Sequence, residues 1–171
     1  MSFLKHNEDL LQILLANPLL IHDEEWRLNN LYWIITKKGT KEPFRMNRAQ
    51  RHFYEKYLKG DKPFHRHLIL KSRQLGFTTF FDIYILDKIL FLPNRDGFIV
   101  AHTVQKAAEI FDKKIDYALR NMCPEVKETY FKLNRNSARA IQAVVDYGPE
   151  KGSTSTIKVG TSPRGETIHY L

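Results

Sequence analysis

The residues best suited to do chemistry lie in one short segment, KSRQLGFTT, at positions 71–79. A phosphate-binding loop needs backbone amides that point at phosphate oxygens, a helix N-terminus that adds positive potential, and a hydroxyl group that reaches Mg²⁺. Gly76 lets the backbone approach a phosphate closely, and Thr78 stands where the magnesium-binding hydroxyl belongs. Thr79 is expected to pack on the new helix. The segment is therefore a candidate phosphate-binding loop.

This segment departs twice from the usual pattern G-x-x-x-x-G-K-[ST]. Lys71 replaces the first glycine, and Phe77 replaces the lysine. The loop keeps two cations, because either Lys71 or Arg73 could fold over it and neutralise the β- and γ-phosphates that the missing lysine would have contacted. The motif taken by itself also fits a simple strand-to-helix turn that needs Gly76.

A second segment, FRMNRAQ at positions 44–50, ends 21 residues before Lys71. The side-chain amide of Gln50 offers a donor and an acceptor, which is what the N6 and N7 edge of adenine requires. Phe44 or Arg45 could stack on the base. The other interpretation of Gln50 is an ordinary surface residue of an amphipathic helix.

A third segment, TSPRGET at positions 161–167, holds Arg164 between a proline and a glycine. An arginine held in such a loop can project its planar guanidinium toward a phosphate. A surface salt bridge between Arg164 and Glu166 explains the same residues without any ligand.

The elements that must position these side chains follow from the apolar pattern. The loop is expected between a short buried strand at 67–70 and a helix at 78–90, followed by a strand at 97–101 and an amphipathic helix at 103–122. Strand, helix, strand and helix in this order predict an α/β fold with a parallel sheet and helical crossovers. The other expected elements are a helix ending at Asn17-Pro18, a helix at 24–36, a polar connection at 37–43, a helix capped by Asn47 and running to 58, a β-hairpin at 138–146 and 154–160, and an apolar strand beginning at 168.

Composition supports an ordinary globular chain. The 171 residues suggest one domain, with 43% hydrophobic and 27% charged residues. The formal charge of +8 favours polyanionic partners such as nucleic acid or nucleotide phosphates, although a solvated basic surface fits as well. Cys123 is the only cysteine, so no internal disulfide can form, and we expect it to be a small buried residue near a helix end. No secretory signal or membrane span is expected.

The run LKSRQLGFTT at 70–79 resembles the deviant Walker A loop of large terminase subunits, the ATPases that drive DNA into the proheads of tailed bacteriophages. In that family a basic residue early in the loop is thought to replace the standard lysine, and both Lys71 and Arg73 match such residues. The resemblance extends over most of the chain from about Trp26, including NRAQ at 47–50, FIVAH at 98–102 and GTSPRG at 160–165.

The resemblance implies a P-loop NTPase of the three-layer, RecA-like kind, with an N-terminal helical segment at 1–43 and a partial ATPase core at 44–171. It implies ATP and Mg²⁺ as cofactors, with Thr78 on the metal and Arg164 as an arginine finger that reaches the nucleotide of a neighbouring subunit. The residues expected to contact the nucleotide are Gln50, Lys71, Ser72, Arg73, Gln74, Leu75, Gly76, Phe77, Thr78 and Thr79.

The resemblance also implies what lies outside this chain. The magnesium-binding carboxylate, the glutamate that activates water and the nuclease domain would all follow Leu171, so the chain alone is expected to hydrolyse almost no ATP. The implied partners are double-stranded DNA, the small terminase subunit, the portal or prohead, and further copies in a ring, without a membrane. The implied location is the host cytoplasm.

Two other classes of function remain open on the sequence. A helicase-like nucleic-acid motor shares the glutamine segment and the loop. A non-enzymatic basic module that binds nucleic acid would use the loop only as a turn. The sequence that follows Leu171 would separate a terminase from a helicase, and protection of Lys71 and Arg73 by nucleotide would exclude the third class.

Overall fold

A computed structural model describes residues 3–60, 67–70 and 75–161. Its four-stranded mixed sheet has the order β3-β6-β5-β4, and a separate hairpin joins β1 and β2. The strands are β1 (Trp33–Ile35), β2 (Lys41–Pro43), β3 (Asp96–Ala101), β4 (Phe131–Ser137), β5 (Ala140–Val145) and β6 (Thr154–Thr161). The helices are α1 (Phe3–Ala16), the short η1 (Pro18–His22), α2 (Glu24–Asn30), α3 (Arg48–Phe53), η2 (Tyr54–Leu58), α4 (Phe77–Phe91), α5 (Val104–Ile110), η3 (Phe111–Ile115), α6 (Asp116–Arg120) and α7 (Pro124–Tyr130).

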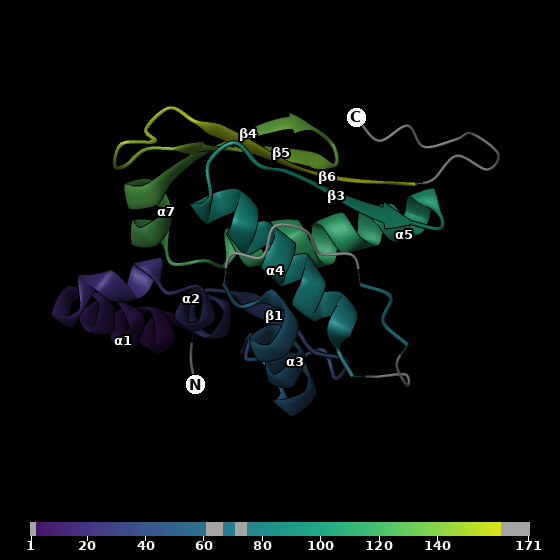
Figure 1. The fold of residues 1–171 in the computed structure, drawn as a ribbon, viewed down its shortest axis with the longest axis horizontal. Helices are drawn as coiled ribbons and strands as arrows, with labels where there is room; N and C mark the ends of the chain where they lie inside the picture. The colour runs from purple at the N-terminus through teal and green to yellow at the C-terminus, as the bar shows by residue number, and fades with distance from the viewer. Residues whose placement is uncertain (1–2, 61–66, 71–74, 162–171) are drawn as a thin grey trace.

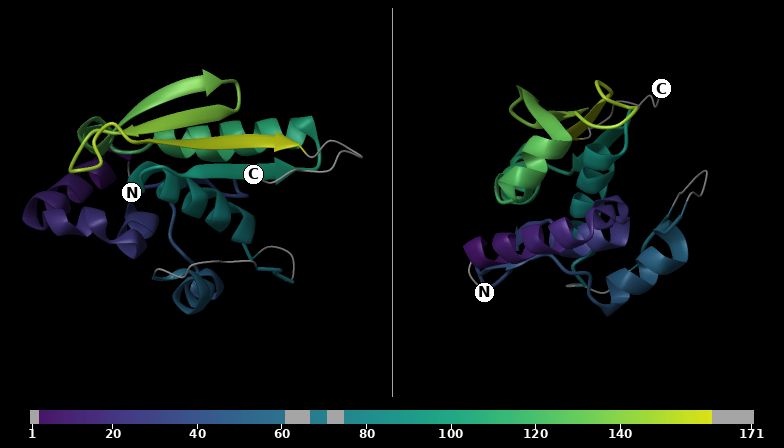
Figure 2. Two further views of the ribbon diagram at one scale, coloured as in Figure 1. Left: turned by 45° about the horizontal axis from the view of Figure 1, so that its top comes forward. Right: turned by 90° about the vertical axis from the view of Figure 1, so that its left-hand side faces the viewer.

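The helices gather on one side of the larger sheet. Figure 1 shows α4 and α5 beneath the sheet, with α1, α2, α3 and the β1–β2 hairpin farther from it. Both views in Figure 2 show the same arrangement, and within the described residues no helix covers the opposite face of the sheet. The chain is thus a mixed α/β fold, while the full three-layer P-loop arrangement remains a prediction.

The N-terminal helices agree only in part with those predicted from the sequence. The first helix ends before Pro18, as predicted. The second was predicted to continue to residue 36, which is wrong, because α2 ends at Asn30 and β1 follows. The side-chain amides of Asn29 and Asn30 donate to the carbonyl oxygens of Glu25 and Trp26, and asparagine disfavours a helix interior by such local bonds.

The polar connection at 37–43 turns out to carry a strand. β2 pairs antiparallel with β1, so that Trp33 lies opposite Pro43 and Ile35 lies opposite Lys41. Gly39 adopts a positive φ of 78° in the turn between them. The two β-branched residues at 34–35 therefore belong to a strand that pairs with β2. Helical spacing of apolar residues, on which the prediction was based, does not test for such pairing.

The predicted strand at 67–70, just ahead of the loop, is wrong. These residues form neither helix nor strand, and the side chains of Leu68 and Leu70 are 91% and 90% exposed. His67 instead packs against Phe53 and Tyr57, with ring centroids 5.5 and 5.7 Å apart. The three apolar residues at 68–70 satisfy the pattern of a short strand, but a strand also needs a neighbour, and none of the described strands pairs with this segment.

The elements after the loop follow the prediction closely. The helix expected at 78–90 is α4, and the strand expected at 97–101 is β3. The amphipathic helix expected at 103–122 is the continuous run α5–η3–α6, with its predicted apolar face buried. The antiparallel hairpin is β5–β6, whereas β4 and α7 were not predicted. Cys123 is buried between α6 and α7, as expected.

The parallel pairing involves different strands from those expected. β3 pairs in parallel with β6, with Asp96 opposite Thr156 and Ala101 opposite Thr161. The prediction placed β3 and the segment at 67–70 in one parallel sheet. Only the parallel character of the pairing was therefore correct.

A buried ion pair ties the N-terminal segment to α4. The guanidinium of Arg27 on α2 donates two hydrogen bonds to one carboxylate oxygen of Asp87 and one to the other, between 2.7 and 3.2 Å. The hydroxyl of Tyr32 donates to the same carboxylate at 2.6 Å, and Arg27 lies 4.3 Å from the ring centre of Phe91. Arg27 and Asp87 are only 4% and 0% exposed, so α2 and α4 share one core.

Candidate nucleotide-binding site

The end of the candidate loop leads directly into helix α4. Gly76 is the N-cap of the 15-residue α4 and adopts a left-handed conformation, with φ 69° and ψ 11°. Since glycine has no side chain, Gly76 itself provides no side-chain cap for the first amides of this helix. Free N–H groups and the helix dipole at this end favour an anion, and Gly76 itself is exposed.

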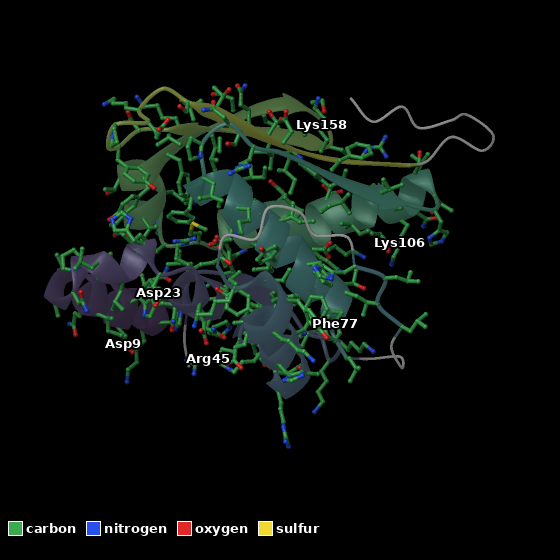
Figure 3. All side chains as sticks on the ribbon, viewed as in Figure 1. Asp9, Asp23, Arg45, Phe77, Lys106 and Lys158 are labelled. Carbon is green, nitrogen blue, oxygen red and sulfur yellow. The ribbon has the colours of Figure 1, made fainter. Side chains whose placement is uncertain are left out.

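Phe77 occupies the position of the standard lysine and faces the core. Its side chain is 7% exposed and meets the ring of Phe53 edge-on at 5.6 Å. The rings of Phe80 and Phe81 lie within 6.2 Å of it. Figure 3 labels Phe77 beside α3. Only its backbone N–H is thus available to a nucleotide, and the positive charge must come from elsewhere.

The two threonines that follow differ in exposure. Thr78 is exposed on the first turn of α4, whereas Thr79 is half-buried. An exposed threonine in the first turn of a helix that starts at a glycine is in the position that a magnesium-binding threonine needs. Thr79 is oriented partly into the protein, which agrees with a packing role. The metal role of Thr78 remains a prediction.

The glutamine segment lies directly against the end of the loop. Gln50 is only 3% exposed, and its Nε2 donates to the carbonyl oxygen of Leu75 at 3.2 Å. A Cβ atom added to Gly76 would lie 2.7 Å from the same Nε2. Two segments 25 residues apart in sequence therefore meet at the Leu75–Gly76 peptide. The order of the motifs suggested this meeting, but nothing in the spacing required it.

The amide of Gln50 is already engaged on both sides. Its Oε1 accepts from the backbone N–H of Asn47 at 2.9 Å, while Nε2 holds Leu75. The predicted contact with adenine therefore has to use the remaining lone pair and hydrogen of this amide, or to replace one of these bonds. Of the two residues proposed to stack on the base, Phe44 is 2% exposed and packs in the core, and Arg45 is exposed.

Sequence reasoning missed a second role of Asn47. It was expected only as a helix cap, and its Oδ1 does accept from the N–H of Gln50 at 3.0 Å. Its Nδ2 also donates to the carbonyl oxygen of Leu75 at 3.1 Å. The available signal was the choice of asparagine, because a cap alone needs only an acceptor.

Several predicted site residues lie outside the described residues. These are Lys71, Ser72, Arg73 and Gln74 of the loop, and Arg164 of the candidate arginine finger. The strand expected from residue 168 also lies outside the described part of the chain. The residues that the structure brings together are Gln50, Leu75, Gly76, Phe77 and Thr78.

Two described cavities lie along the far half of α4 rather than at its start. One, of about 580 Å³, has mostly polar and charged walls that include Glu24, Arg27 and Lys88. The other, of about 340 Å³, lies between α4 and β3 beside Gly97. In the cavity of 580 Å³, burial first and the nearby Glu24 second raise the pKa of Tyr54. Neither cavity is lined by the loop end, so neither marks the predicted nucleotide site.

The described residues contain no group of three or more His, Cys, Asp or Glu side chains placed to hold a metal ion. Thr78 is the one metal ligand predicted from the sequence, and phosphate oxygens and water would supply further ligands to a magnesium ion at the loop. None of the helices in the described part of the chain is long and apolar enough to cross a membrane.

Comparison with known proteins adds one likeness. No protein-family model matches the sequence, and no curated protein is significantly similar to it. Among solved structures, the chain is similar to the ATPase domain of the large terminase of Thermus phage P74-26, in its original and in a substituted form, with a TM-score of 0.40 and 21% identity. The match covers 53% of this chain and 37% of that one. Because the TM-score is this low, we draw the function from the residues of the loop.

Proposed function

We propose that this chain is the nucleotide-binding part of an ATP-driven motor of the large-terminase kind, which moves DNA into a viral prohead. The observation that carries the proposal is the left-handed, exposed Gly76 at the uncapped start of α4, with Gln50 held against it. A plain turn requires the glycine, but it does not require a buried glutamine from an upstream helix beside it. The order of glutamine segment, loop and Arg164 segment in the sequence supports the same assignment.

In this proposal each residue has a stated task. The amides of residues 76–79 hold phosphate oxygens, and Thr78 supplies one ligand to Mg²⁺. Lys71 or Arg73 supplies the charge that Phe77 lacks, and Arg164 reaches the nucleotide of the next subunit. Bound Mg²⁺·ATP supplies the phosphoryl group whose transfer to water releases the free energy for translocation.

The partners follow from charge and resemblance. A formal charge of +8 suits a polyanion, and we propose double-stranded DNA as the track. The small terminase subunit, the portal of the prohead and other copies in a ring are proposed partners, in the host cytoplasm. The chain spans 37% of the solved terminase ATPase chain, and hydrolysis is proposed for the longer motor protein.

Nucleotide binding to the 171-residue chain tests the proposal. Isothermal titration with ATP should give binding that strengthens with Mg²⁺. Thr78→Val removes the hydroxyl while keeping the shape, and it should weaken Mg²⁺·ATP binding by about tenfold, the value of one lost polar contact to a charged group. Thr129→Val is the matched control, because Thr129 is likewise an exposed threonine on a helix, α7, and has no proposed role at the nucleotide, so its loss should leave the affinity within about twofold.

Chemical protection locates the site. ATP should protect Lys71 and Arg73 from lysine- and arginine-specific reagents, while exposed cations far along the chain, such as Lys158, should react as before. Binding that ignores Thr78→Val and leaves Lys71 and Arg73 unprotected would overturn the proposal. The chain would then be a basic binding module in which the loop is only a turn.

A further inference from the structure

The carbonyl oxygen of Leu75 accepts two side-chain hydrogen bonds from a helix far upstream. Asn47 Nδ2 donates at 3.1 Å and Gln50 Nε2 donates at 3.2 Å. Leu75 immediately precedes Gly76, whose positive φ turns the chain into α4. Two donors on one carbonyl fix the plane of the Leu75–Gly76 peptide, and this peptide sets the direction in which the first amides of α4 point.

The two donors also form the cap of their own helix. Asn47 Oδ1 accepts from the N–H of Gln50, and Gln50 Oε1 accepts from the N–H of Asn47, which makes a reciprocal capping box. Each side chain therefore accepts a hydrogen bond within the start of α3 through its oxygen and donates one to the loop through its nitrogen. The orientation of both amide groups is determined, because each oxygen faces a donor and each nitrogen faces a carbonyl.

The helix cap fits these residue types but does not require them. A capping box works as well with serine or threonine first and glutamate three residues later, and neither of these side chains can donate through an amide nitrogen. Asparagine and glutamine thus supply something beyond the cap, which is the pair of N–H donors that hold Leu75. This use is independent of any contact with a base.

We propose that Asn47 and Gln50 are positioning residues of the phosphate site, which hold the Leu75 carbonyl so that the start of α4 faces the nucleotide. The expected effect on nucleotide binding rests on the proposed function. The fixed orientation of the Leu75–Gly76 peptide rests on the hydrogen bonds alone. The proposal assigns Gln50 a role in positioning the loop in addition to the predicted contact with adenine. Positioning acts on any phosphate ligand, whereas base recognition acts only on a ligand with a base.

The double variant Asn47→Ser/Gln50→Glu isolates the positioning role. It keeps a complete capping box and removes both donors to Leu75. The single variants Asn47→Ser and Gln50→Glu each remove one donor, and Asn47→Ala removes the cap as well. Asn121→Ser is the matched control, because the Asn121 side chain also donates to a backbone carbonyl, that of Tyr117, at 2.7 Å at the end of α6.

Amide hydrogen exchange tests the structural half without a ligand. The N–H of Phe80 bonds to the carbonyl of Gly76 at 3.0 Å and reports on the first turn of α4. The double variant should exchange this amide about tenfold faster, and each single variant about threefold faster, while the melting temperature and the α3 amides change little. Asn121→Ser should leave the Phe80 amide unchanged. Unchanged exchange in the double variant would overturn the inference.

Binding of ATP and of inorganic tripolyphosphate tests the functional half. Asn47→Ser should weaken both ligands by the same factor, about threefold, because it acts through the loop. Gln50→Ala, which removes the donor without adding a negative charge beside the phosphates, should weaken tripolyphosphate as well as ATP. Loss of ATP affinity with tripolyphosphate affinity intact would assign Gln50 to the base alone and refute positioning. If the unsubstituted chain binds neither ligand, the proposed function fails, and hydrogen exchange still decides the positioning role.

Discussion

Substitution of Gly76 by alanine gives the sharpest test of the loop geometry. Two separate features of this position make any side chain unfavourable. Its φ of 69° lies in the left-handed region, which costs an alanine roughly 1–2 kcal/mol. The added Cβ would also lie 2.7 Å from Nε2 of Gln50, so the glutamine would have to move. Moving it breaks its bonds to Leu75 and Asn47, at about 1 kcal/mol each.

Gly148→Ala provides the matched control. Gly148 has a similar φ of 64°, but no atom lies within 4 Å of an added Cβ. This substitution therefore carries the left-handed cost without the collision. We expect Gly76→Ala to lower the free energy of unfolding by about 1–2 kcal/mol more than Gly148→Ala does, since the excess is the loss of the Gln50 bonds.

Urea unfolding followed by tryptophan fluorescence measures both free energies. The excess should vanish when Gly76→Ala is made in a Gln50→Ala background, because the obstructing side chain is then already absent. Equal costs for Gly76→Ala and Gly148→Ala would refute the contact between Gln50 and the loop. An excess that persists without the glutamine side chain would refute it as well.

Three further predictions concern the rest of the fold. Asp87→Asn leaves the buried Arg27 without its counter-charge and should lower the unfolding free energy in urea by about 3–5 kcal/mol, whereas Arg27→Met/Asp87→Leu together should cost less than the single change. Gly97→Ala places a Cβ 2.8 Å from Ile85 Cγ2, where β3 lies against α4, and should cost about 1–3 kcal/mol in the same assay. Burial and the neighbouring Asp87 raise the pKa of Tyr32 well above 10.0. The neutral Tyr32 hydroxyl therefore contributes fully to the stability of the fold below pH 10, and this contribution is lost as the pH rises further. The urea midpoint should fall above pH 10, and it should fall less steeply in Tyr32→Phe.

Local signals in the sequence predicted local structure well. The Asn47 cap, the helix after Gly76 and the amphipathic helix after Thr103 were all correct, because each depends on residues within a few positions of one another. The stretch at 67–70 failed for the opposite reason. Its apolar pattern describes what a strand requires, but pairing depends on residues far away that the pattern does not contain.

The candidate site shows the same division. Gly76 and Thr78 could be selected from the loop itself, and the structure places both at the exposed start of α4. The contact of Gln50 with Leu75 could not be derived, because a tertiary hydrogen bond across 25 residues leaves no spacing rule. The second role of Asn47 was hidden behind its first, since asparagine is a common helix cap and the carbonyl to which its amide nitrogen donates lies 28 residues further along the chain.

The inward side chain of Phe77 has a consequence for how this loop could ever change. Introducing the lysine of the common motif at this position would place an ammonium group among the rings of Phe53, Phe80 and Phe81. A single substitution toward the standard loop therefore damages the interior before it improves phosphate contact. Unless the neighbouring aromatic residues change at the same time, the loop keeps its form without a lysine at position 77. Positive charge then has to come from another residue of the loop.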